Sequence, residues 1–233
     1  MNLLDLIRSP HRYFEALRRL PLAPWRLSWL PVLAGLAGGL SSVLLSRSIL
    51  ESQALLLASS TGVQIPAGVF WAFTIIFSAA VSFLSWLVLW GMAQLGAGRE
   101  ARGGEVYGAS FLAPLLWSLV LAVLALLFAP QVSVPVPNLG GLQGAALVSA
   151  VQKYTAAVQE QFSASGVVRF STVMSYAIYL VQFWLALIGL RVMLDEDRNR
   201  AWRGVLYPAL LYLVLGAAAL LVAGAAAGLA GAV

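Results

Sequence analysis

The sequence predicts an all-α fold: an integral membrane five-helix bundle with an N-terminal interfacial amphipathic helix and an amphipathic helix in the long outer loop. Of the 233 residues, 61% are hydrophobic and only 10% are charged, whereas about a quarter of the residues in a soluble domain are charged. The charges are also absent from long apolar runs, and such runs of about 18 residues or more are candidate membrane spans. The chain has no cysteine, which excludes disulfides and thiolate metal sites.

Residues 1–28 are predicted to form a cytoplasmic interfacial segment. Ser9-Pro10 marks a helix start, because serine can cap a helix and proline is tolerated at the first helical position. One apolar face follows at helical spacing, made of Tyr13, Phe14, Leu17 and Leu20. This pattern is typical of a helix that lies in the headgroup plane; the alternative is a helix packed on the spans from outside. No signal-peptide core is present, so we expect the segment to belong to the mature protein.

Residues 29–233 are predicted to form one membrane domain, with spans at about 29–46, 68–95, 107–128, 172–194 and 204–228. The first span contains Gly35 and Gly39, and small residues four apart let helices approach closely. These glycines predict either packing within the chain or a homodimer, and Gly224 and Gly228 offer the same choice.

The longest connection, residues 130–171, is predicted to contain a helix. Apolar side chains recur there at helical spacing with polar residues between them, namely Leu147, Val151, Tyr154, Val158 and Phe162. We expect this amphipathic helix to rest on the membrane or to cap the bundle.

The basic residues predict the orientation of the spans. Five spans place the chain ends on opposite sides, and one side would carry eleven arginines while the other carries Arg47, Lys153 and Arg169. Because basic residues accumulate in cytoplasmic loops, the N-terminus is predicted to be cytoplasmic and the C-terminus outside. This rule also accounts for the formal charge of +5, so no nucleic-acid partner is expected.

Two prolines lie in similar sequence contexts and suggest an internal repeat. Pro114 and Pro208 each follow a charged turn that itself follows a related apolar run, Trp86 to Gly91 or Trp184 to Gly189. Chance similarity between leucine-rich helices is the alternative. Each proline lacks the N–H that bonds four residues back, so the carbonyls of residues 110 and 204 need other partners; the nearby donors are Ser85, Tyr107, Ser110 and Tyr207.

Several of these residues resemble motifs of the Yip family, the Ypt/Rab-interacting membrane proteins. The resemblance rests on Ser9-Pro10 with Phe14, on Tyr107-Gly108-Ala109-Ser110 leading to Pro114, and on Trp184, Gly189, Arg200-Ala201 and Pro208. It implies a single five-helix domain with a cytoplasmic N-terminus. Its eukaryotic members look like trafficking factors that bind prenylated small GTPases, but this chain has no acidic-aromatic motif before the first span. Its many arginines and single lysine are more similar to a bacterial member, in the cytoplasmic membrane.

The sequence predicts neither catalytic residues nor a cofactor or metal site. His11 is the only histidine, which excludes histidine-dependent triads and multi-histidine metal sites. Asp195, Glu196 and Asp197 are the only clustered carboxylates; they could attract Mg²⁺ or Ca²⁺, or cap the next helix and pair with arginines.

We therefore expect a non-enzymatic adaptor that binds the bilayer, anionic lipids or unidentified proteins in membrane organisation or trafficking. Its predicted binding face comprises Arg12, Arg18, Arg19, Arg99, Arg102, Arg198, Arg200 and Arg203. The alternative is a passive transporter, channel or lipid scramblase, because the span interiors have no ionisable residue to couple ions. Its groove would use Ser78, Ser82, Ser85, Tyr107, Ser110, Pro114, Tyr207 and Pro208.

Overall fold

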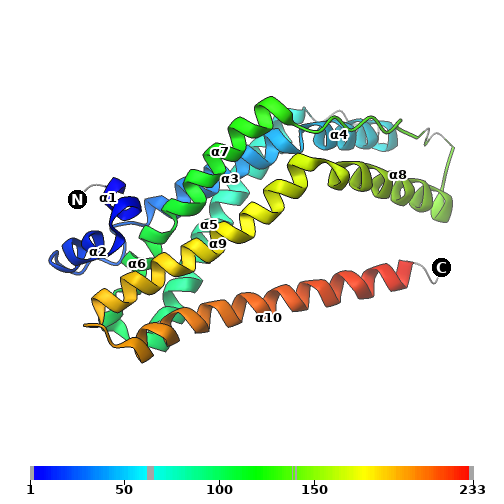
Figure 1. Cartoon of the computed structure of the whole chain (residues 1–233). Helices are drawn as coiled ribbons and strands as arrows, with labels where there is room; N and C mark the ends of the chain where they lie inside the picture. Colours follow the sequence, from blue (N-terminus) through cyan, green and yellow to red (C-terminus); the bar gives the residue numbers. More distant parts are fainter. Residues whose placement is uncertain (1–2, 62–65, 138, 140, 231–233) are drawn as a thin grey trace. The chain divides into compact units, whose positions relative to one another are not determined.

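The structure, a computed structural model of the chain, describes residues 3–61, 66–137, 139 and 141–230, without the side chains of residues 55, 57–61, 215, 216 and 219–230. The described residues form helices and no strand (Figure 1), which confirms the all-α class. The elements are α1 (Leu3–Arg8), α2 (Pro10–Arg18), α3 (Trp29–Leu45), α4 (Arg47–Thr61), α5 (Ala67–Ala97), the 3-10 turn η1 (Arg99–Ala101), α6 (Gly103–Ser110), α7 (Leu112–Phe128), α8 (Gly144–Ala164), α9 (Gly166–Met193) and α10 (Arg198–Ala230).

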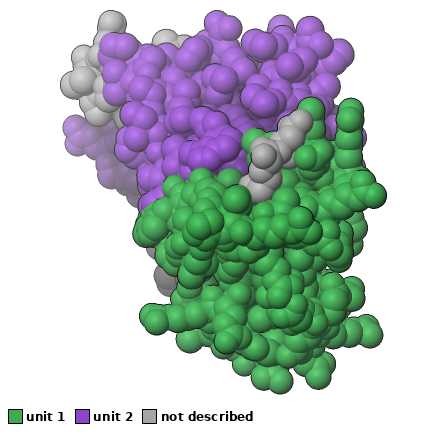
Figure 2. Space-filling view, turned by 90° about the vertical axis from the view of Figure 1, so that its left-hand side faces the viewer, with its two compact units in different colours: residues 1–28, 84–110, 183–233 green, residues 29–83, 111–182 purple. Residues whose placement is uncertain are grey.

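The chain divides into two compact units (Figure 2). Unit 1 comprises residues 1–28, 84–110 and 183–233, and unit 2 comprises residues 29–83 and 111–182. Residues 1–28 thus belong to the same unit as residues 84–110 and 183–233.

Among the described residues, three helical stretches are long and apolar enough to cross a membrane: α5, the run Arg99–Phe128 and α9. The pair Trp29–Leu45 and Arg47–Ala54, bent by 70°, would make a fourth if it counts as one span. Large apolar side chains on these helices are exposed, among them Phe73 (65%), Ile76 (67%), Leu126 (69%) and Leu180 (73%). Such surfaces are rare on soluble proteins, so the helices are compatible with a membrane bundle.

In unit 2, the small residues of α3 make a close contact with α5. A Cβ on Gly35 would lie 2.6 Å from Ala79 Cα, and one on Gly39 would lie 2.6 Å from Ile75 Cα. The Ser82 hydroxyl donates to the Pro31 carbonyl at 2.7 Å. Gly35 and Gly39 are therefore used for packing within the chain. Gly224 and Gly228 lie in the part of α10 whose surroundings are outside the described residues.

In unit 1, the apolar face of α2 is buried in protein. Tyr13, Phe14 and Leu17 are at most 1% exposed, and the Phe14 ring lies where a Cβ on Gly189 would be, 2.8 Å from Phe14 Cζ. The predicted insertion of this face among lipid headgroups is thus not what the structure has, because a glycine on α9 leaves room for the ring. The helix begins at Pro10 as predicted, but the Ser9 side chain makes no cap bond.

The two prolines act differently on their helices. Phe111 separates α6 from α7, and Pro114 is the third residue of α7, whereas α10 continues through Pro208. The two related runs also differ, since Trp86 is fully buried and Trp184 is 55% exposed. The predicted repeat therefore does not extend to equivalent environments.

Helix α8 lies in the long connection of unit 2, with Tyr154 and Val158 as its buried side chains. Both belong to the predicted apolar face, so this face of the helix is the one packed against protein. Whether α8 rests on a membrane stays a prediction.

Candidate functional site

Unit 1 gathers most of the charge of the chain. It contains eleven of the fourteen basic residues and seven of the nine acidic ones, whereas unit 2 contains Arg47, Lys153 and Arg169. The eleven are Arg8, Arg12, Arg18, Arg19, Arg26, Arg99, Arg102, Arg191, Arg198, Arg200 and Arg203. The structure separates them into arginines with internal partners and arginines without.

Arg102 has internal partners at every donor nitrogen. Its Nη1 donates to the carbonyls of Leu17, Arg18 and Leu20, each at 3.0 Å, and its Nη2 donates to Pro21 at 3.2 Å. These are carbonyls at and beyond the end of α2, where the last four have no partner within the helix. Arg102 thus fixes the C-terminal end of α2, and its side chain is only 10% exposed.

The charge of Arg102 is balanced by Glu105, a fully buried carboxylate. Arg102 Nε donates to Glu105 Oε2, and Arg26 Nη1 donates to Glu105 Oε1 at 3.0 Å. A buried carboxylate needs such partners because desolvation of its charge is costly. Sequence reasoning missed Glu105, although its place next to a charge-free apolar run was a signal.

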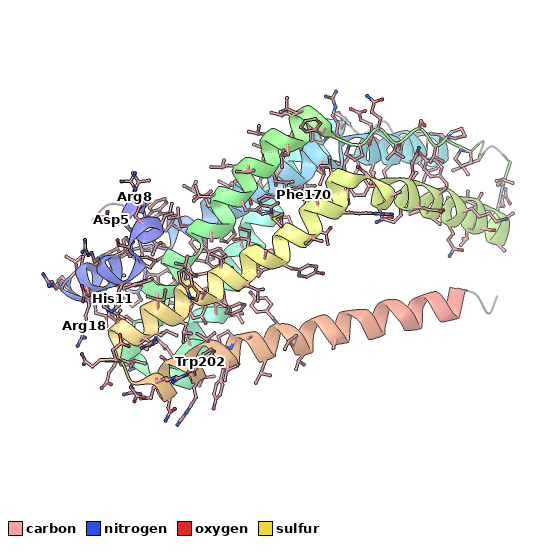
Figure 3. All side chains as sticks on the ribbon, viewed as in Figure 1. Asp5, Arg8, His11, Arg18, Phe170 and Trp202 are labelled. Carbon is pink, nitrogen blue, oxygen red and sulfur yellow. The ribbon has the colours of Figure 1, made fainter. Side chains whose placement is uncertain are left out.

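Arg18 connects α2 with the turn between α9 and α10. It pairs with Asp195 and donates to the Val192 carbonyl at 3.1 Å. The hydrogen bond with Asp195 raises the pKa of Arg18, so this guanidinium stays charged. Arg18 is labelled on α2 in Figure 3.

The three clustered carboxylates are used for this turn. Asp195 and Glu196 have φ of 52° and 65°, a left-handed conformation that non-glycine residues rarely adopt. Glu196 pairs with Arg191, and Asp197 Oδ1 accepts the backbone N–H of Arg200 at 3.1 Å, which caps α10. Among the described residues, no group of three or more His, Cys, Asp or Glu side chains could hold a metal. Asp197 is thus a helix cap, as the second of the two alternatives predicts.

Arg200 joins the turn after α5 to the start of α10. Its Nη2 donates to the Ala97 carbonyl at 2.8 Å and to Glu100 Oε2 at 3.2 Å. Together with Arg102 and Arg18, it connects three segments that are far apart in sequence: the end of α2, residues 98–102 and residues 194–200.

The other predicted binding residues behave differently. Their side chains are exposed and, within the described part of the chain, have no hydrogen bond or ion pair: Arg12, Arg19, Arg99, Arg198 and Arg203, to which Arg8 is added. The predicted set of eight therefore contains three residues that hold the fold together and five that are available to a partner.

Two open hollows lie on unit 1. The larger, about 600 Å³, is lined by His11, Glu15, Arg18, Arg19, Asp195 and Glu196. His11 lies 3.4 Å from Glu15 and 3.6 Å from Glu196, so positive and negative groups are close to balance there. The smaller, about 330 Å³, adjoins Trp90, Gln94 and Arg99 and has no carboxylate in its lining.

A tryptophan cluster lies beside the smaller hollow, and sequence reasoning did not identify it. Trp25, Trp86 and Trp90 contact one another with ring centroids 5.3 to 5.4 Å apart. The buried Trp86 donates to the Gly104 carbonyl at 2.9 Å. Trp25 is 55% exposed, so the cluster connects the interior of unit 1 with its surface.

Tyr13, on α2, is a further buried polar side chain of unit 1. Its hydroxyl has no hydrogen-bond partner in the described part of the chain. Burial, and then the charge of Glu105, raise the pKa of Tyr13 to about 12, while Arg26 opposes the shift.

The residues predicted for a transport groove are divided between the two units. Ser78 and Ser82 lie against α3, Ser110 donates to the Tyr107 carbonyl at 2.8 Å, and the Tyr107 hydroxyl donates to Gly204 at 3.0 Å. Ser85 is half-buried and Tyr207 is exposed. Three of these polar groups, those of Ser82, Tyr107 and Ser110, donate hydrogen bonds to backbone carbonyls.

Comparison of the chain with family models, with curated proteins and with solved structures finds no match. The fold and the site therefore define a class: an all-helical protein with at least three helices able to span a membrane and an arginine-rich unit.

Proposed function

We propose that this protein is a non-enzymatic membrane adaptor that binds anionic lipid, or a protein partner, through the arginine-rich surface of unit 1. In this proposal it is a bacterial member of the Yip family with five spans, α10 being the last. Its N-terminus, the end of α2, residues 98–102 and residues 194–200 lie in the cytoplasm.

The observation that carries the proposal is the group of exposed arginines without partners in unit 1. Arg102, Arg18 and Arg200 are used internally, so the fold does not need Arg12, Arg19, Arg99, Arg198 and Arg203 for those links. An anionic leaflet attracts a basic residue near its surface by about 1 kcal/mol, and salt weakens the attraction. Five such residues are enough for a strong preference for anionic lipid.

Family membership is supported by where the motif residues lie. Phe14 fits against Gly189, Gly108 lies against Leu27, and Tyr107 bonds Gly204. Loose sequence motifs that meet in one unit are better support than the same motifs apart. The single histidine lies beside Glu15 and Glu196, and the proposal includes no catalysis.

Lipid retention tests the proposed function. The full chain is placed in bilayers of phosphatidylcholine and phosphatidylglycerol, extracted with surrounding lipid, and the retained lipids are counted by mass spectrometry. Reversal of two charges in Arg12→Glu with Arg19→Glu removes at least about 2 kcal/mol of attraction, so the preference for phosphatidylglycerol falls steeply. The control, Lys153→Glu with Arg169→Glu, changes the same charge in unit 2. Equal effects of the two pairs would refute the proposed face.

Reporter fusions test the proposed orientation. A reporter active only in the cytoplasm should be inactive when fused at Val233 and active when fused ahead of Leu3. Activity at Val233 would contradict the five-span topology, and with it the cytoplasmic placement of the exposed arginines.

The transport alternative has less support, because Ser82 is hydrogen-bonded to Pro31 and faces α3. Reconstituted vesicles separate the two functions. Solute flux or lipid scrambling that is lost in Ser82→Leu would favour transport, whereas the adaptor predicts no flux under any gradient.

A further inference from the structure

We propose that the smaller hollow of unit 1 is a binding site for the phosphate group of an anionic phospholipid. The proposal rests on the proposed function and names the place and the ligand chemistry of one lipid contact. The site is lined by Trp90, Gln94, Arg99 and Gly104, together with Leu22, Pro24 and the internally paired Arg102.

Gly104 packs closely against two residues that line the hollow, Pro24 and Trp90. A Cβ on Gly104 would lie 2.9 Å from the Pro24 carbonyl oxygen and 3.2 Å from the Trp90 ring. Any larger residue there would therefore push the wall of the hollow aside. Trp90 is held in turn by Trp25 and Trp86, so this wall is rigid.

Three polar groups at the hollow have no partner of their own in the described part of the chain. They are the Arg99 guanidinium, the Gln94 amide and the Trp90 indole N–H. All three residues line the hollow, and the guanidinium fork of Arg99 matches the oxygens of a phosphate. A phosphate diester in the hollow would accept from Arg99 beside two further residues that carry N–H donors.

The charge around the hollow favours an anion. Glu105 is shared between Arg102 and Arg26, and Glu100 is paired with Arg200. The residues that line the hollow thus include no carboxylate to balance Arg99. The larger hollow differs in this respect, because its three carboxylates face two arginines and a histidine.

The rim of the hollow indicates that the anion carries an apolar part. Leu22, which lines the hollow, is 60% exposed, and Trp25, whose ring contacts Trp90, is 55% exposed. Tryptophan prefers the depth at which headgroups meet acyl chains, and α5 ends only a few residues beyond Trp90 and Gln94. A phospholipid can place its phosphate on Arg99 and its glycerol and upper acyl chain against Leu22 and Trp25.

The test uses the full chain in neutral nanodiscs of phosphatidylcholine, titrated with phosphatidylglycerol and read by native mass spectrometry. Arg99→Gln should weaken the tightest phosphatidylglycerol site about tenfold, because it removes a charge-assisted contact. Gln94→Leu should weaken it about threefold. The matched control, Arg198→Gln, removes another exposed arginine without a partner in unit 1 and should leave this site unchanged.

Three results would overturn the proposal. Equal losses in Arg99→Gln and Arg198→Gln would mean that charge acts diffusely, so the site fails while the proposed function stands. No preference for phosphatidylglycerol in the unaltered protein would refute both. Displacement of the lipid by millimolar inorganic phosphate would assign the hollow to a free phosphate compound instead of a lipid.

Discussion

Replacement of Tyr107 with phenylalanine should measure how the protein compensates for a proline inside a membrane helix. The Tyr107 hydroxyl donates to the Gly204 carbonyl at 3.0 Å. Residue 204 lies four positions before Pro208, which is inside α10 and has no N–H to give. The substitution therefore removes the donor that the structure provides for this carbonyl.

The expected cost follows from two competing estimates. An unsatisfied buried polar group costs about 1–3 kcal/mol, whereas hydrogen bonds between membrane helices average about 0.6 kcal/mol with a maximum of about 1.7 kcal/mol. The lower average arises because the unfolded chain in a membrane finds other partners. Tyr107 is fully buried, and the carbonyl has lost its own helical donor, so we expect about 1.5 kcal/mol.

Pro208→Ala provides the second arm of a double-mutant cycle. Alanine restores the backbone N–H, which can bond the Gly204 carbonyl within α10. In that background Tyr107→Phe should cost less than about 0.5 kcal/mol, because the carbonyl keeps a partner. The coupling energy between the two positions should then be about 1 kcal/mol.

The assay is reversible unfolding in mixed detergent micelles, followed by circular dichroism. Tyr207→Phe is the control, because Tyr207 is 41% exposed on the same helix, and it should change stability by less than about 0.5 kcal/mol. The reasoning is refuted if Tyr107→Phe has the same cost with proline and with alanine at position 208.

Three further predictions follow from contacts in the two units. Gly35→Ala should destabilise the protein by about 1–3 kcal/mol through overpacking against the α5 backbone. The control, Gly91→Ala, meets no atom within 4 Å and should be neutral or stabilising by up to about 1 kcal/mol. Equal melting temperatures of the two variants would contradict this prediction. Arg102→Lys should lower the free energy of unfolding by about 2–4 kcal/mol, because an ammonium cannot donate to four carbonyls and Glu105 at once. Limited proteolysis should then cleave this variant within residues 1–28 sooner than it cleaves the control Arg12→Lys. The phenol of Tyr13 should ionise near pH 12, measured as the difference in ultraviolet titration between the protein and Tyr13→Phe. Because the folded pKa of Tyr13 is raised, its contribution to stability is complete below pH 10 and is lost as the pH rises through 12. An ionisation midpoint at pH 10 would contradict the burial of this side chain.

The sequence was sufficient to predict the helical class and most of the apolar stretches, because a scarcity of charge over about 20 residues is a property of composition alone. The start of α2 at Pro10 was also predicted, since proline fixes its own φ. What α2 faces was not predictable. Lipid headgroups and a protein surface both accept the same apolar stripe, and the choice depended on Gly189, which is distant in sequence from Phe14.

The sequence predicted which arginines belong to the candidate site, but not which of them bind internal partners and which are exposed. Arg99 and Arg102 lie three residues apart in one glycine-rich turn, yet one is exposed without a partner and the other bonds four carbonyls. The difference arises from the end of α2, whose last carbonyls need donors and accept from Arg102. No local pattern around the turn contains that information.

The same contrast explains why the exposed arginines, rather than all arginines, carry the proposed function. Arg102 and Arg26 neutralise a carboxylate that is fully buried, so removal of either would leave an unpaired charge in the protein and affect folding first. Arg99 neutralises no buried carboxylate in the described part of the chain, and the same holds for Arg12, Arg19, Arg198 and Arg203. A substitution at these five positions changes the field that unit 1 presents without removing an internal bond. A loss of lipid preference there, with an unchanged unfolding midpoint, can therefore be assigned to binding, whereas the same loss at Arg102 cannot.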